Sequence, residues 1–170
     1  KLMKKLKEWG IENDTILIFM SDNGASATNF NAGMKGTKGT VDEGGTRVPF
    51  FIRWPGVTKP GMDCDRLANH YDLLSTFAEI AGVEPKGKDK LHGLSLLPLI
   101  RDPKTDWADR YRVFHKGRWE YGVEPQKNAS FSVRSQRWRL VGSDQLYDME
   151  NDPGQEKMFL LRILKLRRRC

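Results

Sequence analysis

The sequence predicts an α/β core followed by a smaller α+β part with an antiparallel sheet, and three patterns support this fold class. Residues 15–20 form a continuous apolar run of strand length, which is typical of a central parallel strand covered on both faces. Residues 67–81 carry apolar side chains at a helical period and end at Gly82. After Arg110, short β-type segments follow one another with short connections, which favours antiparallel pairing.

The expected elements follow in order along the chain. Residues 1–9 look helical and lead through Gly10 into the strand 15–20, and the helix 67–81 comes after a long loop region. A charged connector then precedes the apolar stretch 91–100, which we expect to pack between the two parts. The later strands are expected over residues 111–115, 130–134, 138–141 and 145–147. This order predicts an α/β part over residues 1–104, an antiparallel subdomain over 105–157 and a basic tail over 158–170.

The first strand runs directly into Ser21, Asp22, Asn23 and Gly24. Open α/β sheets bind ligands at the carboxyl ends of their strands. A carboxylate and an amide oxygen adjacent in sequence are ligands that hard cations such as Ca²⁺ or Mg²⁺ accept. Taken alone, however, these four residues are more often a plain loop opening, because they are among the commonest turn residues.

The following segment, residues 34–47, holds four glycines, two lysines and an arginine, and is too glycine-rich for a helix. Glycines let a backbone approach an anion closely, and a lysine offers a compact positive charge. The segment is not a P-loop, because G-x-x-x-x-G-K-[ST] does not occur in it. By itself such a loop is usually a solvated surface loop, so the anion-binding interpretation depends on its neighbours.

The apolar strand, the Ser-Asp-Asn-Gly turn and the stretch GTKGTVDEGGTRVPFFIRWPG, in that order, resemble the sulfatase family of the alkaline phosphatase superfamily. The resemblance continues through NHYDLLSTFAEIAG, HGLSLLPLI, SVRSQRWRLV and QLYDMENDPGQEK, and so covers most of the chain. It implies part of an alkaline phosphatase-like sandwich with a central, mostly parallel sheet, followed by a small α+β C-terminal subdomain with an antiparallel sheet.

The resemblance also implies roles for particular residues. In sulfatases the Asp and Asn of this turn ligate a divalent cation, usually Ca²⁺ with Mg²⁺ possible, so Asp22 and Asn23 become the expected metal ligands. The family's loop lysine that contacts the sulfate group falls on Lys38, whereas Lys35 is expected to be an ordinary loop lysine. The family's E-G-G-x-R turn, expected to be the structural scaffold of the site, falls on Glu43, Gly44, Gly45 and Arg47.

Residues near the end of the expected strand 111–115 are candidates for substrate contact. His115, Lys116 and Arg118 lie in the subdomain that in sulfatases can border the substrate cleft. The substrate implied by the resemblance is a sulfated small molecule or a sulfated carbohydrate. Trp138 between two arginines would also suit base stacking, but alternation along a sheet edge explains it more simply, so no nucleic-acid partner is expected.

The nucleophile of the family is a formylglycine made from Cys or Ser in a C-x-P-x-R or S-x-P-x-R motif. Neither motif occurs in these 170 residues, and Cys64 lies in a Met-Asp-Cys-Asp-Arg-Leu context without the proline. We therefore expect this chain to be the C-terminal part of a sulfatase whose N-terminal part supplies the nucleophile, and to be inactive alone. Family resemblance gives the periplasm, the extracellular space or the lysosome as its expected location.

The net charge of +7 is concentrated near the end of the chain, because residues 157–170 hold six basic residues and no acidic one. Without them 23 basic face 22 acidic residues, so the tail is either a polyanion- or membrane-surface-binding segment or an incidental end. No apolar run approaches the roughly 18 residues that a transmembrane helix needs. Two other functions stay open: a phosphatase or phosphodiesterase of the same superfamily, and a non-catalytic fragment that only binds.

Overall fold

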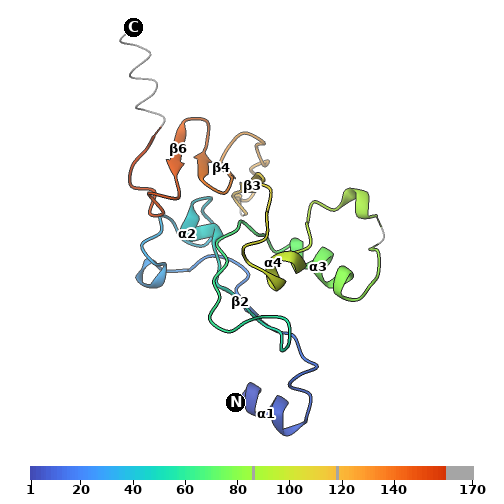
Figure 1. Ribbon diagram of the computed structural model, residues 1–170. Coiled ribbons are helices and arrows are strands. Elements are labelled where there is room, and N and C mark those ends of the chain that lie inside the picture. The colour runs from blue at the N-terminus through green and yellow to red at the C-terminus, as the bar shows by residue number, and fades with distance from the viewer. Residues whose placement is uncertain (86, 118, 160–170) are drawn as a thin grey trace. The chain divides into compact units, whose positions relative to one another are not determined.

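A computed structural model describes residues 1–85, 87–117 and 119–159 of the chain (Figure 1). Its internal contacts divide the chain into two compact units. Unit 1 comprises Lys1–Phe19 and Phe51–Ala108, and unit 2 comprises Met20–Phe50 and the residues from Asp109 onward. None of the described helices has the length and apolar character that crossing a bilayer requires.

Unit 1 holds most of the helices and the two strands of a small sheet. Its elements are α1 (Leu2–Glu8), β1 (Leu17–Met20), β2 (Phe50–Arg53), α3 (Asp72–Ile80), the 3₁₀ turn η2 (Lys88–Lys90) and α4 (Leu97–Arg101). Met20 and Phe50, at the ends of β1 and β2, group by their contacts with unit 2. The buried apolar side chains of unit 1 are Leu6, Ala78, Leu96, Leu97 and Leu99.

The first expected strand is confirmed as β1, which pairs with β2 in a two-stranded sheet. Within the described residues the cover expected on both faces is incomplete. Phe19 on β1 is 64% exposed and Phe51 on β2 is 66% exposed, and their ring centroids lie 6.2 Å apart. The apolar composition of β1 therefore exceeds what the described residues bury.

The expected helix 67–81 forms, but it begins at Asp72 rather than at residue 67. The buried carboxylate of Asp72 accepts hydrogen bonds from the backbone N–H groups of Asn69, at 2.6 Å, and Leu94, at 3.0 Å. These bonds hold the preceding residues in a turn and so set the start of the helix. The apolar stretch 91–100 packs on α3 within unit 1, where the Thr76 hydroxyl accepts the Leu96 N–H at 2.8 Å.

Unit 2 contains the four-stranded antiparallel sheet that the sequence predicted. Its strands are β3 (Arg112–His115), β4 (Phe131–Arg134), β5 (Trp138–Val141) and β6 (Gln145–Asp148), in that spatial order. Val133 lies opposite Val113 on one side and Leu140 on the other. The alternation of the sequence thus sets the register.

The segment Met20–Phe50 groups with this sheet by its contacts, although the predicted division after residue 104 assigned it to the α/β part. That domain assignment stays a prediction. The segment contains a 3₁₀ turn, η1 (Thr28–Phe30), and a single helical turn, α2 (Glu43–Thr46), which lies beside the sheet in Figure 1. We expected no helix in this glycine-rich stretch. The turn forms because the Arg47 N–H donates to the Glu43 carbonyl at 2.7 Å in a closely packed setting.

Candidate functional site

The Ser-Asp-Asn-Gly turn rests directly on the backbone of α2. The Gly24 N–H donates to the Gly45 carbonyl at 3.1 Å. A Cβ atom added to Gly24 would lie 2.0 Å from the Gly44 carbonyl oxygen and 2.7 Å from the Gly45 Cα, far inside van der Waals contact. Only glycine therefore allows this approach, which places Asp22 and Asn23 immediately before a fixed point on α2.

The lysine-bearing loop is tied to the same turn. The Lys38 N–H donates to the Ala25 carbonyl at 2.8 Å, two residues after Asn23. Gly36, at φ +80°, and Gly39, at φ +91°, adopt the left-handed conformation that favours glycine, and they bend the loop on either side of Lys38. The structure thus brings Asp22, Asn23 and Lys38 into one loop cluster.

The two lysines of the loop differ in their surroundings. The Lys35 ammonium donates to the Tyr147 hydroxyl on β6 at 3.0 Å and lies 4.0 Å from an Asp42 carboxylate oxygen. The Tyr147 hydroxyl, and more weakly Asp42, raise the pKa of Lys35. Lys38 is exposed and forms no ion pair with any described residue. Its charge is therefore available for an external anion.

Asp22 and Asn23 suit a divalent cation in the kind of donor atom they offer. Asp22 is exposed and Asn23 is half-buried, so both can present oxygen atoms to a cation. Ca²⁺ takes six to eight oxygen ligands, however, and two residues supply only part of such a set. Within residues 1–85, 87–117 and 119–159 no group of three or more His, Cys, Asp or Glu side chains is placed to hold a metal.

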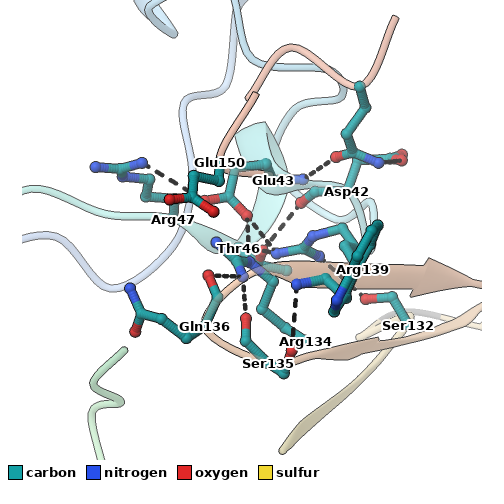
Figure 2. A network of polar contacts seen from close by, with 12 residues as sticks. Asp42, Glu43, Thr46, Arg47, Ser132, Arg134, Ser135, Gln136, Arg139 and Glu150 are labelled. Carbon is teal, nitrogen blue, oxygen red and sulfur yellow. Dashed lines mark hydrogen bonds and ion pairs between the residues drawn. The ribbon is translucent and has the colours of Figure 1, made fainter. Parts of the chain in front are cut away.

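Glu43 carries the main polar network of unit 2, which Figure 2 shows. Its side chain is 5% exposed. One carboxylate oxygen lies 2.6 Å from Arg139 Nη2 and 3.4 Å from Arg134 Nε, and the other lies 3.6 Å from Arg47 Nη1. The carboxylate that pairs with Arg47 is thus that of Glu43, four residues before it.

Arg139 on β5 is the most extensively bonded partner of this network. Its side chain donates to the Val41 carbonyl at 2.5 Å, to the Ser132 hydroxyl at 3.1 Å and to the Thr46 hydroxyl at 3.0 Å, in addition to Glu43. Burial lowers the pKa of the Arg139 guanidinium, and the Glu43 carboxylate acts in the opposite direction. An arginine nevertheless keeps its charge at neutral pH.

A second link to α2 comes from Gln155. Its side-chain oxygen accepts the Glu43 N–H at 2.8 Å, and its amide nitrogen donates to Asp42 at 3.1 Å. Sequence reasoning did not single out Arg134, Arg139 or Gln155. Their signal lay in the matched segments SVRSQRWRLV and QLYDMENDPGQEK, which pointed to strands and a turn but not to buried charge.

The predicted substrate-contact residues lie apart from these bonds. His115 and Lys116 are exposed at the end of β3, and the His115 ring lies 6.2 Å from the Phe131 ring. Among the described residues, neither side chain forms a hydrogen bond or ion pair with the loop around Lys38. Arg118 lies outside the described residues.

Comparison with known proteins gives a consistent result. The family model described as Sulfatase matches residues 1–83. The chain is 30% identical over 156 residues to the uncharacterized sulfatase YdeN of Escherichia coli, covering 90% of this chain and 23% of that protein. It is 33% identical over 158 residues to an arylsulfatase of Clostridium perfringens, covering 88% of this chain and 30% of the relative.

Solved structures match the chain in fold. The structure of Ps i-CgsB in complex with k-i-k-neocarrahexaose matches at a TM-score of 0.73 and 29% identity, covering 96% of this chain and 36% of that one. The α/β fold is thus that of the alkaline phosphatase-like sulfatases. The chain spans about a quarter of the length of the first curated relatives, namely 23%, 21% and 25%. Together these matches show that the chain belongs to the sulfatase family.

Proposed function

We propose that the chain supplies the cation- and sulfate-binding side of an active site that hydrolyses sulfate esters. The observation that carries this proposal is the hydrogen bonding that joins two loops: Lys38 N–H to Ala25, and Gly24 N–H to Gly45. These bonds hold the backbone of an exposed lysine, Lys38, close to the turn that carries the Asp-Asn pair. A sulfate group that also contacts a hard cation is bound by such a pairing, in which the oxygen ligands hold the cation and the lysine carries positive charge to the sulfate oxygens.

In this proposal Asp22 and Asn23 hold a divalent cation, Ca²⁺ or Mg²⁺, which would polarise a sulfate oxygen when bound. Lys38 binds a second oxygen of the sulfate group through its ammonium. Glu43, Gly44, Gly45 and Arg47 form the scaffold beneath both loops. The overall reaction consumes one water, breaks the ester linkage and releases an alcohol and inorganic sulfate.

The nucleophile in the proposal is a formylglycine from outside these 170 residues. Its support is that neither C-x-P-x-R nor S-x-P-x-R occurs in the sequence, while the matched relatives are three to four times longer than the matched region. On this basis the 170 residues alone bind ligands weakly and do not turn over a sulfate ester.

A sulfated carbohydrate is the substrate class we favour. One relative is named an ulvan-active sulfatase and is 30% identical over 144 residues, covering 81% of this chain and 25% of that protein. A structural neighbour at 29% identity holds k-i-k-neocarrahexaose. His115 and Lys116, exposed at the end of β3, are the described residues that we assign to contact with the sugar.

The proposal is tested by titrating the ¹⁵N-labelled chain with CaCl₂ and then with sodium sulfate, following amide resonances by NMR. Because the chain offers few ligands, the expected calcium Kd is on the order of 1 mM, at the weak end for protein calcium sites. Asp22→Asn should abolish the calcium shifts, and Lys38→Ala should abolish the sulfate shifts. Asp63→Asn and Lys59→Ala, exposed residues of unit 1, are the matched controls and should leave both unchanged.

Two results would count against the proposal. If neither ion shifts the amides of residues 21–25 and 36–40, the loops are not a binding site in this chain. If inorganic phosphate binds at least as well as sulfate at Lys38, a phosphatase or phosphodiesterase activity becomes the better account.

A further inference from the structure

The sheet of unit 2 buries positive charge where a sheet normally buries apolar side chains. Arg134 on β4 and Arg139 on β5 are opposite each other in register, and their side chains share one face. They are 9% and 1% exposed. Two guanidinium groups side by side repel each other, and a buried charge without a partner is strongly unfavourable. A carboxylate between them is therefore required for this packing.

That carboxylate comes from α2, not from the sheet. Glu43 accepts from both arginines, and Arg139 also donates to Val41 and Thr46. Arg139 thus contacts three residues of the segment 41–46 through its two terminal nitrogens. A guanidinium presents its donors in a fixed planar fork, so these bonds define the position of α2 in a way that a lysine could not.

α2 packs directly against both loops of the candidate site, the Ser-Asp-Asn-Gly turn and the loop around Lys38, so its position determines theirs. A Cβ on Gly45 would lie 2.4 Å from the Thr40 carbonyl oxygen and 2.6 Å from the Thr37 carbonyl oxygen, so Gly45 abuts the backbone on both sides of Lys38. Gly45 also accepts the Gly24 N–H, next to Asn23. A shift of α2 cannot leave these loops in place, because interiors packed this closely transmit displacements.

We propose that Arg139 is a positioning residue for the candidate site: through Glu43 it fixes α2, and through α2 it fixes Lys38 relative to the Asp22–Asn23 pair. The predicted effect on sulfate affinity rests on the proposed function. The structural part of the inference concerns the loops alone and stands without any ligand.

The test compares Arg139→Lys and Arg139→Met with Arg137→Met in the full 170-residue chain. Arg137 is the matched control, because it lies next to β5 but is half-exposed and pairs with Asp148 instead. Two quantities are measured well below the melting temperature: the amide chemical shifts of Gly24 and Lys38 without ligand, and the Kd for sodium sulfate. A purely stabilising role would lower the melting temperature but leave both quantities unchanged in the folded protein.

We expect both Arg139 variants to shift the amide resonances of Gly24 and Lys38. Sulfate binding should weaken about tenfold or more in Arg139→Met and by less in Arg139→Lys. Arg137→Met should change neither the resonances nor the sulfate affinity. Unmoved resonances in folded Arg139→Met would overturn the inference. If the unaltered chain binds no sulfate, the proposed function fails, while the ligand-free resonances still decide the positioning role.

A milder variant covers the case in which Arg139→Met does not fold. Thr46→Val keeps the size of the side chain but removes the hydroxyl that accepts from Arg139 at 3.0 Å. Movement of the Gly24 and Lys38 resonances in this variant supports the inference. Resonances that coincide with those of the unaltered chain, in both Thr46→Val and Arg139→Lys, overturn it.

Discussion

The buried pair of Glu43 and Arg139 gives a quantitative prediction for stability. Glu43 is 5% exposed and Arg139 is 1% exposed, with 2.6 Å between their closest oxygen and nitrogen. Removing one partner of such a pair typically costs about 3–5 kcal/mol, because the other charge remains buried. For Arg139→Met we expect about 3 kcal/mol, at the lower end of that range. The reason is that Arg134 remains 3.4 Å from Glu43.

Glu43→Met should cost at least as much, since it leaves two opposed arginines without their carboxylate. The double variant should cost less than the two single changes added together, with a coupling of about 2–3 kcal/mol. Urea denaturation followed by far-UV circular dichroism at pH 7 measures all four proteins of the cycle. A cost below about 1 kcal/mol for Arg139→Met, or simple additivity in the double variant, would refute the reasoning.

Two further predictions concern other parts of unit 2. Gly24→Ala should lower the free energy of unfolding by at least about 2 kcal/mol, because its Cβ would lie 2.0 Å from the Gly44 carbonyl oxygen. Gly117→Ala is the control: a Cβ there would have nothing within 4 Å, so the same urea experiment should show no loss of stability from crowding. Hydrogen bonds from Arg137, and then from Asn151, lower the pKa of the Asp148 carboxyl below its usual 3.8. The ionised Asp148 carboxylate therefore contributes to stability above pH 3.8, and this contribution is lost as the pH falls below that value. Asp148→Asn should remove this acid-dependent part of the stability from urea midpoints measured between pH 5 and pH 2. An unchanged pH profile in Asp148→Asn would contradict the assignment.

Local patterns predicted several helices and strands of this chain, but not the strand β2 or the single helical turn α2. Alternation and β-type residues gave the four strands β3 to β6, and the apolar run gave β1, because both signals arise from side chains close in sequence. The start of α3 was predicted five residues too early. Its actual start depends on Asp72 accepting the N–H of Leu94, 22 residues away, and local periodicity carries no such information.

The residues of the candidate site stay a prediction from the family resemblance, and the side chains that support their loops were not predicted. Family resemblance selected Asp22, Asn23 and Lys38, and the structure places their loops together. The resemblance did not reveal that Arg139 is buried, because arginine in a strand normally indicates a solvated position. Its burial depends on Glu43, which lies 96 residues away in the sequence.

The central claim is that the two loops form one site in which cation and sulfate meet. The most direct test is to measure the sulfate Kd of the chain by NMR with and without saturating Ca²⁺. If both ions share the site, Ca²⁺ should strengthen sulfate binding about fivefold or more, and sulfate should strengthen Ca²⁺ binding by the same factor. A sulfate Kd that is the same with and without Ca²⁺ would contradict the account.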